Sequence, residues 1–273
     1  MNDAFDFVKS HGLGNDYLVI DPTRLDFELT PARARLICHR NLGVGSDGIL
    51  VVSKNAAADF AVRILNPDGS EAEKSGNGLR IFAKFLYDHG YTKKREFTVH
   101  TPGGIVREQI LDDGVRVEMG QASIDRKLTK LEVAGRVLDI TSLSVGNPHC
   151  VTIVTELTPE LLKLGAAIEN HPAFPKRTNV QFAQVLDRGN VRALIWERGA
   201  GHTLASGSSS CAVAAACSDK GLVDSPVTVH MEGGDLIIEV DKALNLVMTG
   251  PVEEVCVGTF SEEFKRRLMA TVD

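Results

Sequence analysis

Two serines stand at matching places in two similar passages of the chain. Ser75 opens the run Ser-Gly-Asn-Gly and an apolar stretch that ends at Gly90, while Ser206 opens Ser-Gly-Ser-Ser and a stretch that ends at Gly221. The two copies are 131 positions apart. Each serine precedes a predicted helix, where a side-chain oxygen most often caps the free N–H groups. The same N–H groups and the positive end of the helix dipole also bind carboxylates or phosphates.

The repeat favours a shared anion site over two unrelated helix caps. Small residues follow each serine and would let a ligand approach the backbone closely. We therefore predict that Ser75 and Ser206 face each other across one cleft and exchange protons with a bound ligand. The residues predicted to bind that ligand through the helix ends are Gly76, Asn77, Gly207 and Ser208.

Polar islands between the apolar runs supply further candidates for this site. Asn beside Gly or Pro is ordinary turn chemistry, and for any single island that interpretation is the better one. Asn66 and Glu197, however, each stand nine residues before a serine of the repeat, which places them at equivalent strand ends. An arginine for a carboxylate and a glutamate for an ammonium group would suit a zwitterionic ligand. The predicted binding residues from these islands are Asn15, Asn66, Asn147, His149, Asn179, Glu197 and Arg198.

Two other kinds of site are disfavoured by their sequence context. The run Gly43–Gly48 fits G-x-G-x-x-G, but it follows a predicted helix and leads into a strand, the reverse of a dinucleotide-binding turn. His149-Cys150 has no second ligand pair at metal-binding spacing. No passage resembles a phosphate cradle for pyridoxal phosphate. We predict a site without metal or cofactor.

Length and composition limit the class of protein. A chain of 273 residues with 43% apolar content can form two domains, each with its own core. The net charge of −6 and the scattered Lys and Arg argue against a nucleic-acid partner. The sequence has neither an apolar run of membrane-spanning length nor an export-signal pattern at its start. Five cysteines without paired spacing predict a reduced, cytoplasmic setting, and the expected partner is a small amino acid or dicarboxylic acid.

The elements that would position these residues follow the repeat. Helices are predicted over 30–38, 78–90, 208–220 and 261–269, and strands over 5–9, 17–20, 48–52, 60–65, 97–99, 104–106, 115–117, 150–154, 179–182 and 191–196. The predicted fold class is α+β, with two pseudo-symmetric domains, each a curved, mostly antiparallel sheet wrapped around a central helix. The predicted domains are 1–121, onto which 262–273 packs, and 122–261, with a linker near Gly120–Arg126.

The ordered series of motifs resembles the diaminopimelate epimerase family over nearly the whole chain. The motifs begin at Gly14 (Gly-Asn-Asp), Gly43, Asn66 (Asn-Pro-Asp-Gly-Ser), Ser75, Gly146 (Gly-Asn-Pro-His), Asn179 (Asn-Val-Gln-Phe) and Trp196 (Trp-Glu-Arg-Gly). The resemblance implies a homodimer that epimerises an amino-acid α-carbon without pyridoxal phosphate or metal. The implied reaction converts LL- to meso-diaminopimelate in lysine and cell-wall biosynthesis.

The chain departs from this family pattern at the centre of the chemistry. The family has cysteines where this chain has Ser75 and Ser206, a glycine at Ser209, and usually a glutamate at His202. In the family one thiolate removes the α-proton while the other thiol protonates the opposite face. A thiol with a reference pKa of about 8.5 suits both tasks near neutral pH. An aliphatic hydroxyl is far less acidic, with a pKa close to that of water, and needs an activator. His202, four residues before Ser206, is a possible activator.

Three hypotheses explain these departures. The serines could be engineered to trap substrate in an ordinary epimerase, although the changes at Ser209 and His202 go beyond a double cysteine-to-serine replacement. The chain could be a serine branch that acts as an isomerase or dehydratase on a related carboxylic acid. It could also be a catalytically weak amino-acid-binding homologue, because a fold does not fix a function.

Overall fold

The computed structural model describes residues 5–272 and divides into two compact units. The first unit contains the chain up to Val117 together with the part from Pro251 onward, and the second unit is Glu118–Gly250. The chain thus leaves the first unit once and returns to it near its C-terminal end. Residues 1–4 and 273, which fall in the predicted first domain and its C-terminal segment, lie outside the described residues.

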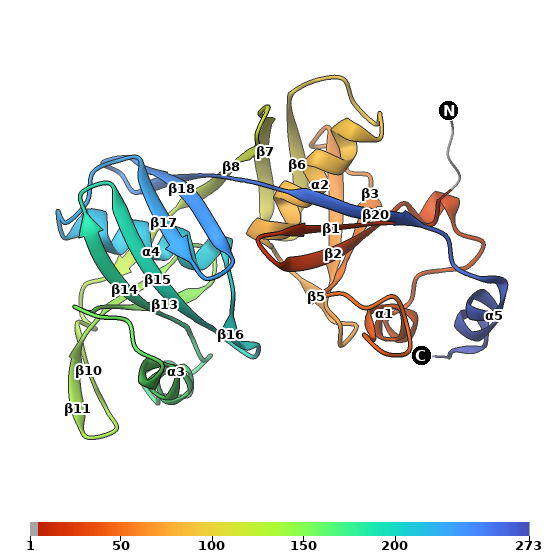
Figure 1. Ribbon diagram of the computed structural model, residues 1–273. Helices are drawn as coiled ribbons and strands as arrows, with labels where there is room; N and C mark the ends of the chain where they lie inside the picture. Colours follow the sequence, from red (N-terminus) through yellow and green to blue (C-terminus); the bar gives the residue numbers. More distant parts are fainter. Residues whose placement is uncertain (1–4, 273) are drawn as a thin grey trace. The chain divides into compact units, whose positions relative to one another are not determined.

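The first unit is a curved sheet around α2 (Gly76–Asp88) (Figure 1). Helix α2 is buried on nearly every side over its first three turns, as expected of a central helix. Strand pairs β2–β3 and β4–β6 are parallel, and the other pairs are antiparallel. Its strands are β1 (Phe7–Gly12), β2 (Asn15–Ile20), β3 (Ile49–Ser53), β4 (Phe60–Leu65), β5 (Glu71–Ala72), β6 (Glu96–Thr101), β7 (Gly104–Ile110), the start of β8 (Val115–Gln121) and β20 (Glu253–Gly258).

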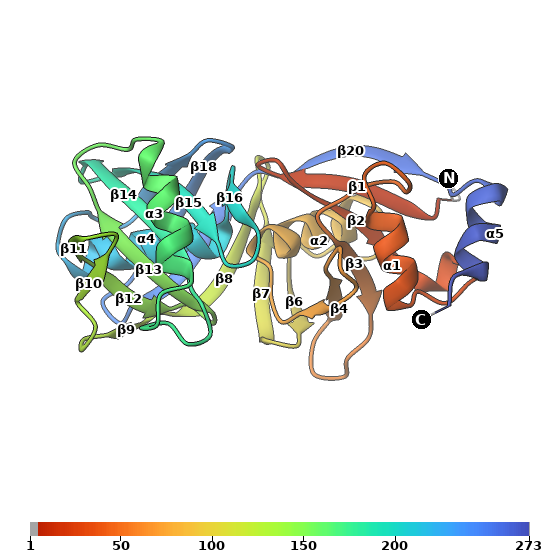
Figure 2. The same cartoon turned by 90° about the horizontal axis from the view of Figure 1, so that it is seen from below.

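The second unit repeats this arrangement around α4 (Gly207–Asp219) (Figure 2). Its parallel pairs are β13–β14 and β15–β17, which correspond to β2–β3 and β4–β6. A separate hairpin joins β10 (Lys130–Val133) to β11 (Arg136–Asp139). The remaining strands are β9 (Ser123–Asp125), β12 (Thr141–Ser144), β13 (Pro148–Ile153), β14 (Asn179–Asp187), β15 (Asn190–Glu197), β16 (Gly201–Thr203), β17 (Val227–Met231), β18 (Gly234–Val240) and β19 (Asn245–Gly250). The predicted α+β class, with two similar halves built on central helices, is confirmed.

Outer helices cover the face of each sheet that points away from the central helix. In the first unit α1 (Pro31–Cys38) and α5 (Glu262–Ala270) pack on alternate residues of β2 and β3, which include Leu18 and Ile49. In the second unit α3 (Glu160–Glu169) packs in the same way against β13, β14 and β15. Because successive strand residues point to opposite faces, each of these sheets is buried on both sides. This explains the continuous apolar runs in the sequence.

The predicted helices and strands are present, but one helix and ten of the described strands were not predicted: β5, β9–β12 and β16–β20. Helix α3 was not predicted, although Thr158-Pro159 before it repeats the Thr30-Pro31 start signal of α1 and Glu160 lies in its first turn. The segment predicted as a linker, 120–126, contains the end of β8 and strand β9, and β9 pairs with β12. A short 3-10 turn, Pro22–Arg24, follows β2.

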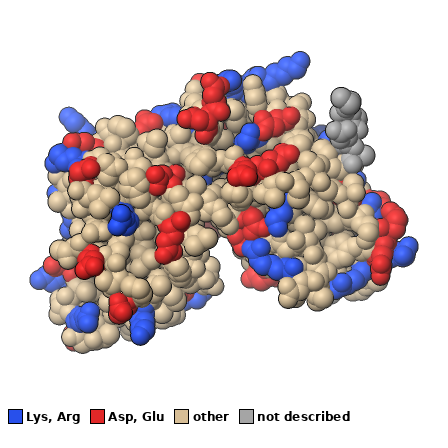
Figure 3. Space-filling view, viewed as in Figure 1, with Lys and Arg blue, Asp and Glu red and all other residues tan. Residues whose placement is uncertain are grey.

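The surface carries charges of both signs. On the face of each unit shown in Figure 3, acidic and basic side chains are interspersed. Among the described residues, no helix is both long enough and apolar enough to cross a membrane.

Candidate functional site

Ser75 and Ser206 are the N-caps of α2 and α4. The Gly78 N–H donates to Ser75 Oγ at 3.0 Å, and the Ser209 N–H donates to Ser206 Oγ at 3.4 Å. Both serines have extended backbones, with φ of −137° and −147°. A hydroxyl has one donor and two acceptor positions, and the cap uses only one acceptor position, so the O–H can still donate to another group. The predicted helix ends are therefore present, and each offers N–H groups of its first turn beside a hydroxyl.

Ser75 also contacts a phenol that was not predicted. Tyr17 lies on β2, is 7% exposed, and places its hydroxyl 3.1 Å from Ser75 Oγ. Gly48 makes room for the Tyr17 ring, because a Cβ at this position would lie 2.7 Å from the ring carbon Cε1. The glycine-rich turn before β3 thus has a local packing role beside the serine.

A chain of hydrogen bonds brings Asn15 and Asn77 together in the first unit. Asn15 Nδ2 donates to Asp47 at 2.8 Å, and Asn15 Oδ1 accepts from Asn77 Nδ2 at 3.1 Å. Asn77 Oδ1 accepts from the buried Arg80 at 3.0 Å. Because Asn77 lies in the first turn of α2, this chain fixes the first turn against β2. Asp47 and Arg80 were not predicted; the repeat gave no signal for them.

An ion-pair cluster holds the other end of that chain. One Nη of Arg40 lies 2.8 Å from Asp16 and 2.6 Å from Asp47, and Lys9 lies 3.0 Å from Asp16. Burial acts to raise the pKa of Asp16, but hydrogen bonds from Arg40 and Lys9 outweigh it and lower the pKa. Asp16 is therefore a stable anion that anchors the start of β2.

The hydrogen bonds of Asn66 among the described residues all lie within its own turn. It lies in the turn after β4, where its Nδ2 donates to Ser70 Oγ at 2.9 Å and its backbone N–H donates to Ser70 O at 2.8 Å. The turn interpretation accounts for these bonds, and a ligand-binding role for Asn66 stays a prediction.

A buried polar chain links His149 to the start of α4. Gln181 Nε2 donates to His149 Nδ1 and to Ser209 Oγ, both at 3.0 Å. An amide nitrogen cannot accept, so His149 carries its proton on Nε2, which donates to Asn147 Oδ1 at 2.9 Å. Burial lowers the pKa of His149 to about 3, with the positive charge of Arg198 acting in the same direction and the Gln181 bond opposing both. His149 is therefore a neutral positioning group.

Residues around Glu197 and Arg198 are held by two buried polar side chains. Asn179 accepts from the Arg198 N–H at 3.0 Å and donates to the Pro148 carbonyl at 2.9 Å. Glu169, which was not predicted, is 5% exposed and accepts from Trp196 Nε1 and the Gly199 N–H, both at 2.8 Å. The loop that carries the predicted Glu and Arg is thus fixed on both sides.

His202 has a partner other than Ser206. Its Nε2 lies 2.6 Å from Glu232 Oε2, and both side chains are partly exposed. A role for His202 as activator of Ser206 stays a prediction.

The native thiols do not replace the missing site cysteines. Burial raises the pKa of Cys150 and of Cys217 to about 12. Cys38 and Cys211 are also buried, and Cys256 is exposed. Within residues 5–272, no group of three or more His, Cys, Asp and Glu side chains could hold a metal ion.

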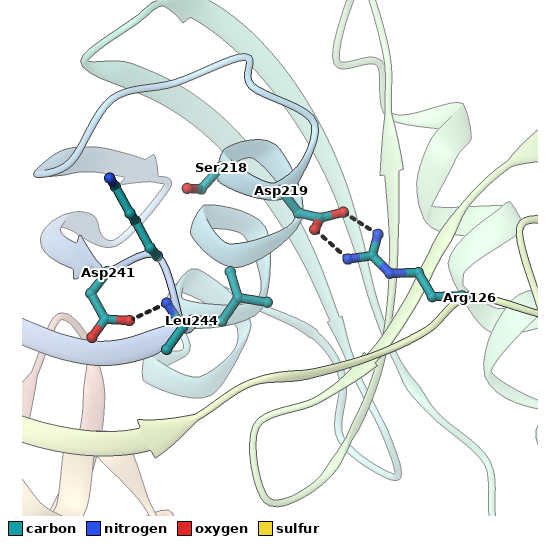
Figure 4. A pocket seen from close by; sticks show the side chains of 7 residues that line it. Arg126, Ser218, Asp219, Asp241 and Leu244 are labelled. Atoms are coloured by element: carbon teal, nitrogen blue, oxygen red, sulfur yellow. Dashed lines mark hydrogen bonds and ion pairs between the residues drawn. The ribbon is translucent and has the colours of Figure 1, made fainter.

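A pocket of about 380 Å³ lies at the far end of α4 (Figure 4). Arg126 forms a bidentate ion pair with Asp219, the last residue of that helix, in which its two Nη atoms lie 2.5 and 2.6 Å from the carboxylate oxygens. Since α4 has 13 residues, its ends are about 20 Å apart. The pocket is therefore separate from the Ser206 end of the helix. Its lining residues are Arg126, Ser218, Asp219, Asp241, Lys242, Ala243 and Leu244.

Comparison with solved structures defines the fold class. A probable proline racemase from Agrobacterium radiobacter K84 has a TM-score of 0.73 at 15% identity, covering 94% of this chain and 92% of that chain. A hydroxyproline epimerase from Agrobacterium vitis has a TM-score of 0.71 at 17% identity, covering 92% and 90%. The chain therefore has the fold of these racemase and epimerase structures.

Sequence relatives define the family within that fold. A diaminopimelate epimerase 2 from Nostoc sp. is 47% identical over 273 residues, which is 94% of this chain and 96% of that protein. A diaminopimelate epimerase from Azoarcus sp. is 43% identical over 268 residues, or 92% and 97%. The family model described as diaminopimelate epimerase matches residues 7–124 and 141–255. The chain belongs to the diaminopimelate epimerase family.

Proposed function

We propose that this protein is a cofactor-independent amino-acid epimerase that interconverts LL- and meso-diaminopimelate. The observation that carries the proposal is the pair of serine-capped helices, α2 and α4, at equivalent places in two similar units of a family member. Each helix end combines a hydroxyl with free N–H groups that suit a carboxylate. The two hydroxyls are the groups proposed to transfer protons at the α-carbon of the ligand.

The proposed site consists of two half-sites. The first half-site is Ser75 with the N–H groups of Gly76 and Asn77, and the second is Ser206 with those of Gly207 and Ser208. In each direction one hydroxyl takes the α-proton while the other supplies a proton to the opposite face. The side chains proposed to hold the rest of the zwitterion are Asn15, Asn66, Asn147, Asn179, Glu197 and Arg198, with His149 and the possible activator His202 behind them.

The serines make slow turnover the expected result. An aliphatic hydroxyl, whose pKa is close to that of water, is a far poorer acid than a thiol with a pKa of about 8.5. Proton transfer by a well-matched group contributes a factor of about 10² to 10⁴ to the rate. We expect the serine protein to lack most of that factor, and Ser75→Cys with Ser206→Cys together to restore it.

Deuterium wash-in at the α-carbon tests this proposal. Each protein is incubated with LL-diaminopimelate in heavy water, and exchange is followed by mass spectrometry and NMR. We expect the double cysteine variant to exchange at least about a hundredfold faster than the serine protein. Ser210→Cys, a buried serine four residues after Ser206 in α4, serves as the control and should not raise exchange. Absence of exchange in the double variant, with binding measured by calorimetry, would refute the epimerase proposal.

Two other functions are distinguished by the same measurement. Fast exchange by the serine protein with a different carboxylic acid would favour a serine-type isomerase or dehydratase. Tight binding without exchange in either form would favour an amino-acid-binding homologue. The diaminopimelate epimerase relatives and the ordered Glu197-Arg198 loop support the epimerase over both.

We further propose a homodimer that works in the cytoplasm. Family membership supports the dimer, and the five free cysteines support a reducing compartment. Light scattering on the eluting protein tests the oligomeric state, since a monomer at all concentrations would contradict the dimer.

A further inference from the structure

The two half-sites of the proposed epimerase differ in what touches the serine. In the first unit the Tyr17 hydroxyl lies 3.1 Å from Ser75 Oγ, and either oxygen could donate. The Gly78 N–H occupies one acceptor position of the same hydroxyl at 3.0 Å. Ser75 therefore has a titratable neighbour in direct hydrogen-bond contact.

The repeat gives His149 the place that Tyr17 holds in the first unit. Val19, two residues after Tyr17, pairs with Leu50 in β3, and Val151, two residues after His149, pairs with Gln181 in β14. Leu50 and Gln181 are 131 positions apart, the offset of the repeat, so Tyr17 and His149 occupy equivalent places. Tyr17 reaches its serine directly, whereas His149 is joined to the start of α4 through Gln181 and Ser209. The phenol beside the serine is thus a property of the first half-site.

The Ser206 surroundings are less able to supply a proton. Its backbone N–H points to Met231 Sδ at 3.5 Å, and its Oγ accepts from the Ser209 N–H. His149, the equivalent of Tyr17, is neutral and has both ring nitrogens occupied by Asn147 and Gln181. None of these contacts brings an acid to the Ser206 hydroxyl.

A phenol comes closer than a serine hydroxyl to the acidity that the reaction needs. Reference pKa values are about 10 for tyrosine and 8.5 for cysteine, and the pKa of a water-like hydroxyl is far higher than either. Efficiency in general acid–base catalysis increases as the pKa of the group approaches the working pH. A serine joined to a phenol can therefore act with much of the phenol's acidity.

We propose that Tyr17 is a positioning residue that supplies and removes the proton of Ser75. When the first half-site acts as acid, the Ser75 O–H proton passes to the α-carbon and the phenol proton passes to Ser75 Oγ, leaving a phenolate. When it acts as base, Ser75 Oγ takes the α-proton and gives its own to the phenolate, while the C–H electron pair stays on the α-carbon. Protons and charge balance in both directions, and Ser75 ends each transfer neutral.

This inference rests on the proposed function for its consequence, but its core can be tested without turnover. The chain has three tyrosines, and ¹³C labelling at their ring Cζ atoms gives three signals that titrate with pH. Tyr17→Phe identifies the Tyr17 signal by its loss. A hydrogen bond worth about 0.5–1.5 kcal/mol to the phenolate corresponds to a midpoint shift of about 0.4–1 pH unit.

The decisive comparison is Ser75→Ala against Ser206→Ala. We expect Ser75→Ala to raise the Tyr17 titration midpoint by at least about 0.4 pH unit, because it removes a donor to the phenolate. Ser206→Ala, the matched change in the repeat, should leave the midpoint unmoved. A midpoint indifferent to Ser75→Ala, or equally shifted by Ser206→Ala, would overturn the proposal.

Deuterium exchange then tests the consequence. Tyr17→Phe should slow exchange by about tenfold or more in the Ser75 protein and by much less in the Ser75→Cys protein, whose thiol supplies its own acidity. The rise of the base-direction rate with pH should disappear in Tyr17→Phe. Equal losses in both backgrounds would mean a packing role and would overturn the proposal. If no form exchanges while the titration shift is observed, the epimerase proposal fails and the Ser75–Tyr17 proton contact stands.

Discussion

At the scale of single residues, the proposed proton chemistry is governed by what surrounds each hydroxyl. The hydroxyl of Ser75 contacts the phenol of Tyr17. The residue that donates its N–H to the capping serine is Gly78 in the first unit and Ser209, which has a hydroxyl of its own, in the second. A Cβ at Gly78 would lie 3.2 Å from Ser75 Oγ, which is a close contact. The capping hydrogen bond from Ser209 N to Ser206 Oγ is 3.4 Å long, whereas the bond from Gly78 N to Ser75 Oγ is 3.0 Å, and the longer bond occurs where Ser209 has a side chain. Two serines at equivalent places in the repeat therefore have different hydrogen-bond partners.

The neutral state of His149 gives a prediction for stability against pH. Its pKa is lowered from 6.5 to about 3 in the folded chain. Between these values the unfolded chain binds a proton that the folded chain does not, so unfolding is favoured as pH falls. We expect His149→Gln to lose less unfolding free energy than the wild type between pH 6.5 and 4, as measured by urea titration. Parallel losses in the two proteins would contradict the buried neutral histidine.

At the scale of elements, the central helices have different partners in the two sheets. Arg80 of α2 is fully buried and corresponds to Cys211 of α4. Glu108 of β7 corresponds to Ile238 of β18. The β6–β7 hairpin closes with the pair Thr101–Gly104 and the β17–β18 hairpin with Met231–Gly234, and each of the two residues lies four positions after that glycine. Glu108 has Phe97 and Val117 as its strand neighbours, and neither of its oxygens has a hydrogen-bond partner among the described residues.

This asymmetry predicts that Glu108→Ile stabilises the first unit. An unpartnered buried polar group costs about 1–3 kcal/mol, so the variant should gain about that amount at neutral pH. Burial raises the pKa of Glu108 well above 4.5, although the charges of Lys74 and Arg80 oppose it. Above pH 4.5 the folded chain keeps a proton that the unfolded chain loses, so wild-type stability falls as pH rises.

Urea unfolding at pH 4.5 and pH 7 checks this prediction. The advantage of Glu108→Ile should be larger at pH 7 than at pH 4.5. The matched change in the second unit, Ile238→Glu, should be destabilising. A loss of stability in Glu108→Ile would mean that attraction to Arg80 and Lys74 outweighs the cost of burial.

At the scale of the whole molecule, the chain end completes the first unit. Leu268 of α5 is fully buried in a core cluster with Phe7, Ile37 and Phe260. Asp6 accepts the Phe260 N–H at 2.7 Å, which ties the segment before α5 to the start of the chain. The first unit therefore folds from segments more than 250 positions apart in sequence.

Leu268→Ala is expected to destabilise the first unit by about 2–5 kcal/mol, because it leaves a cavity in this core. The aromatic residues provide separate reporters: the single tryptophan, Trp196, is in the second unit and the three tyrosines are in the first. The tyrosine-detected urea midpoint should fall. Met269→Ala, at a position that is 47% exposed, should change little. A fall detected by Trp196 alone would contradict the placement of α5.

Sequence alone determined the repeat, the central helices and the serine caps. N-cap residues, periodic apolar residues and a glycine after the last turn are local signals, so α1, α2, α4 and α5 could be predicted from short stretches. Helix α3 was missed although Thr158-Pro159 repeats the start signal of α1, and the structure shows it packed on its sheet. The ordered polar motifs also indicated the family, because each is a short local pattern.

Only the tertiary structure decided which side chains touch Ser75 and Ser209 at the starts of α2 and α4. Tyr17 is 58 positions from Ser75, and Gln181 is 28 positions from Ser209, so no local pattern links them. Their contacts follow from the register of β2 with β3 and of β13 with β14, which long-range packing fixes. Burial, which keeps His149 neutral and raises the pKa of Glu108, likewise depends on the assembled units and not on neighbours in sequence.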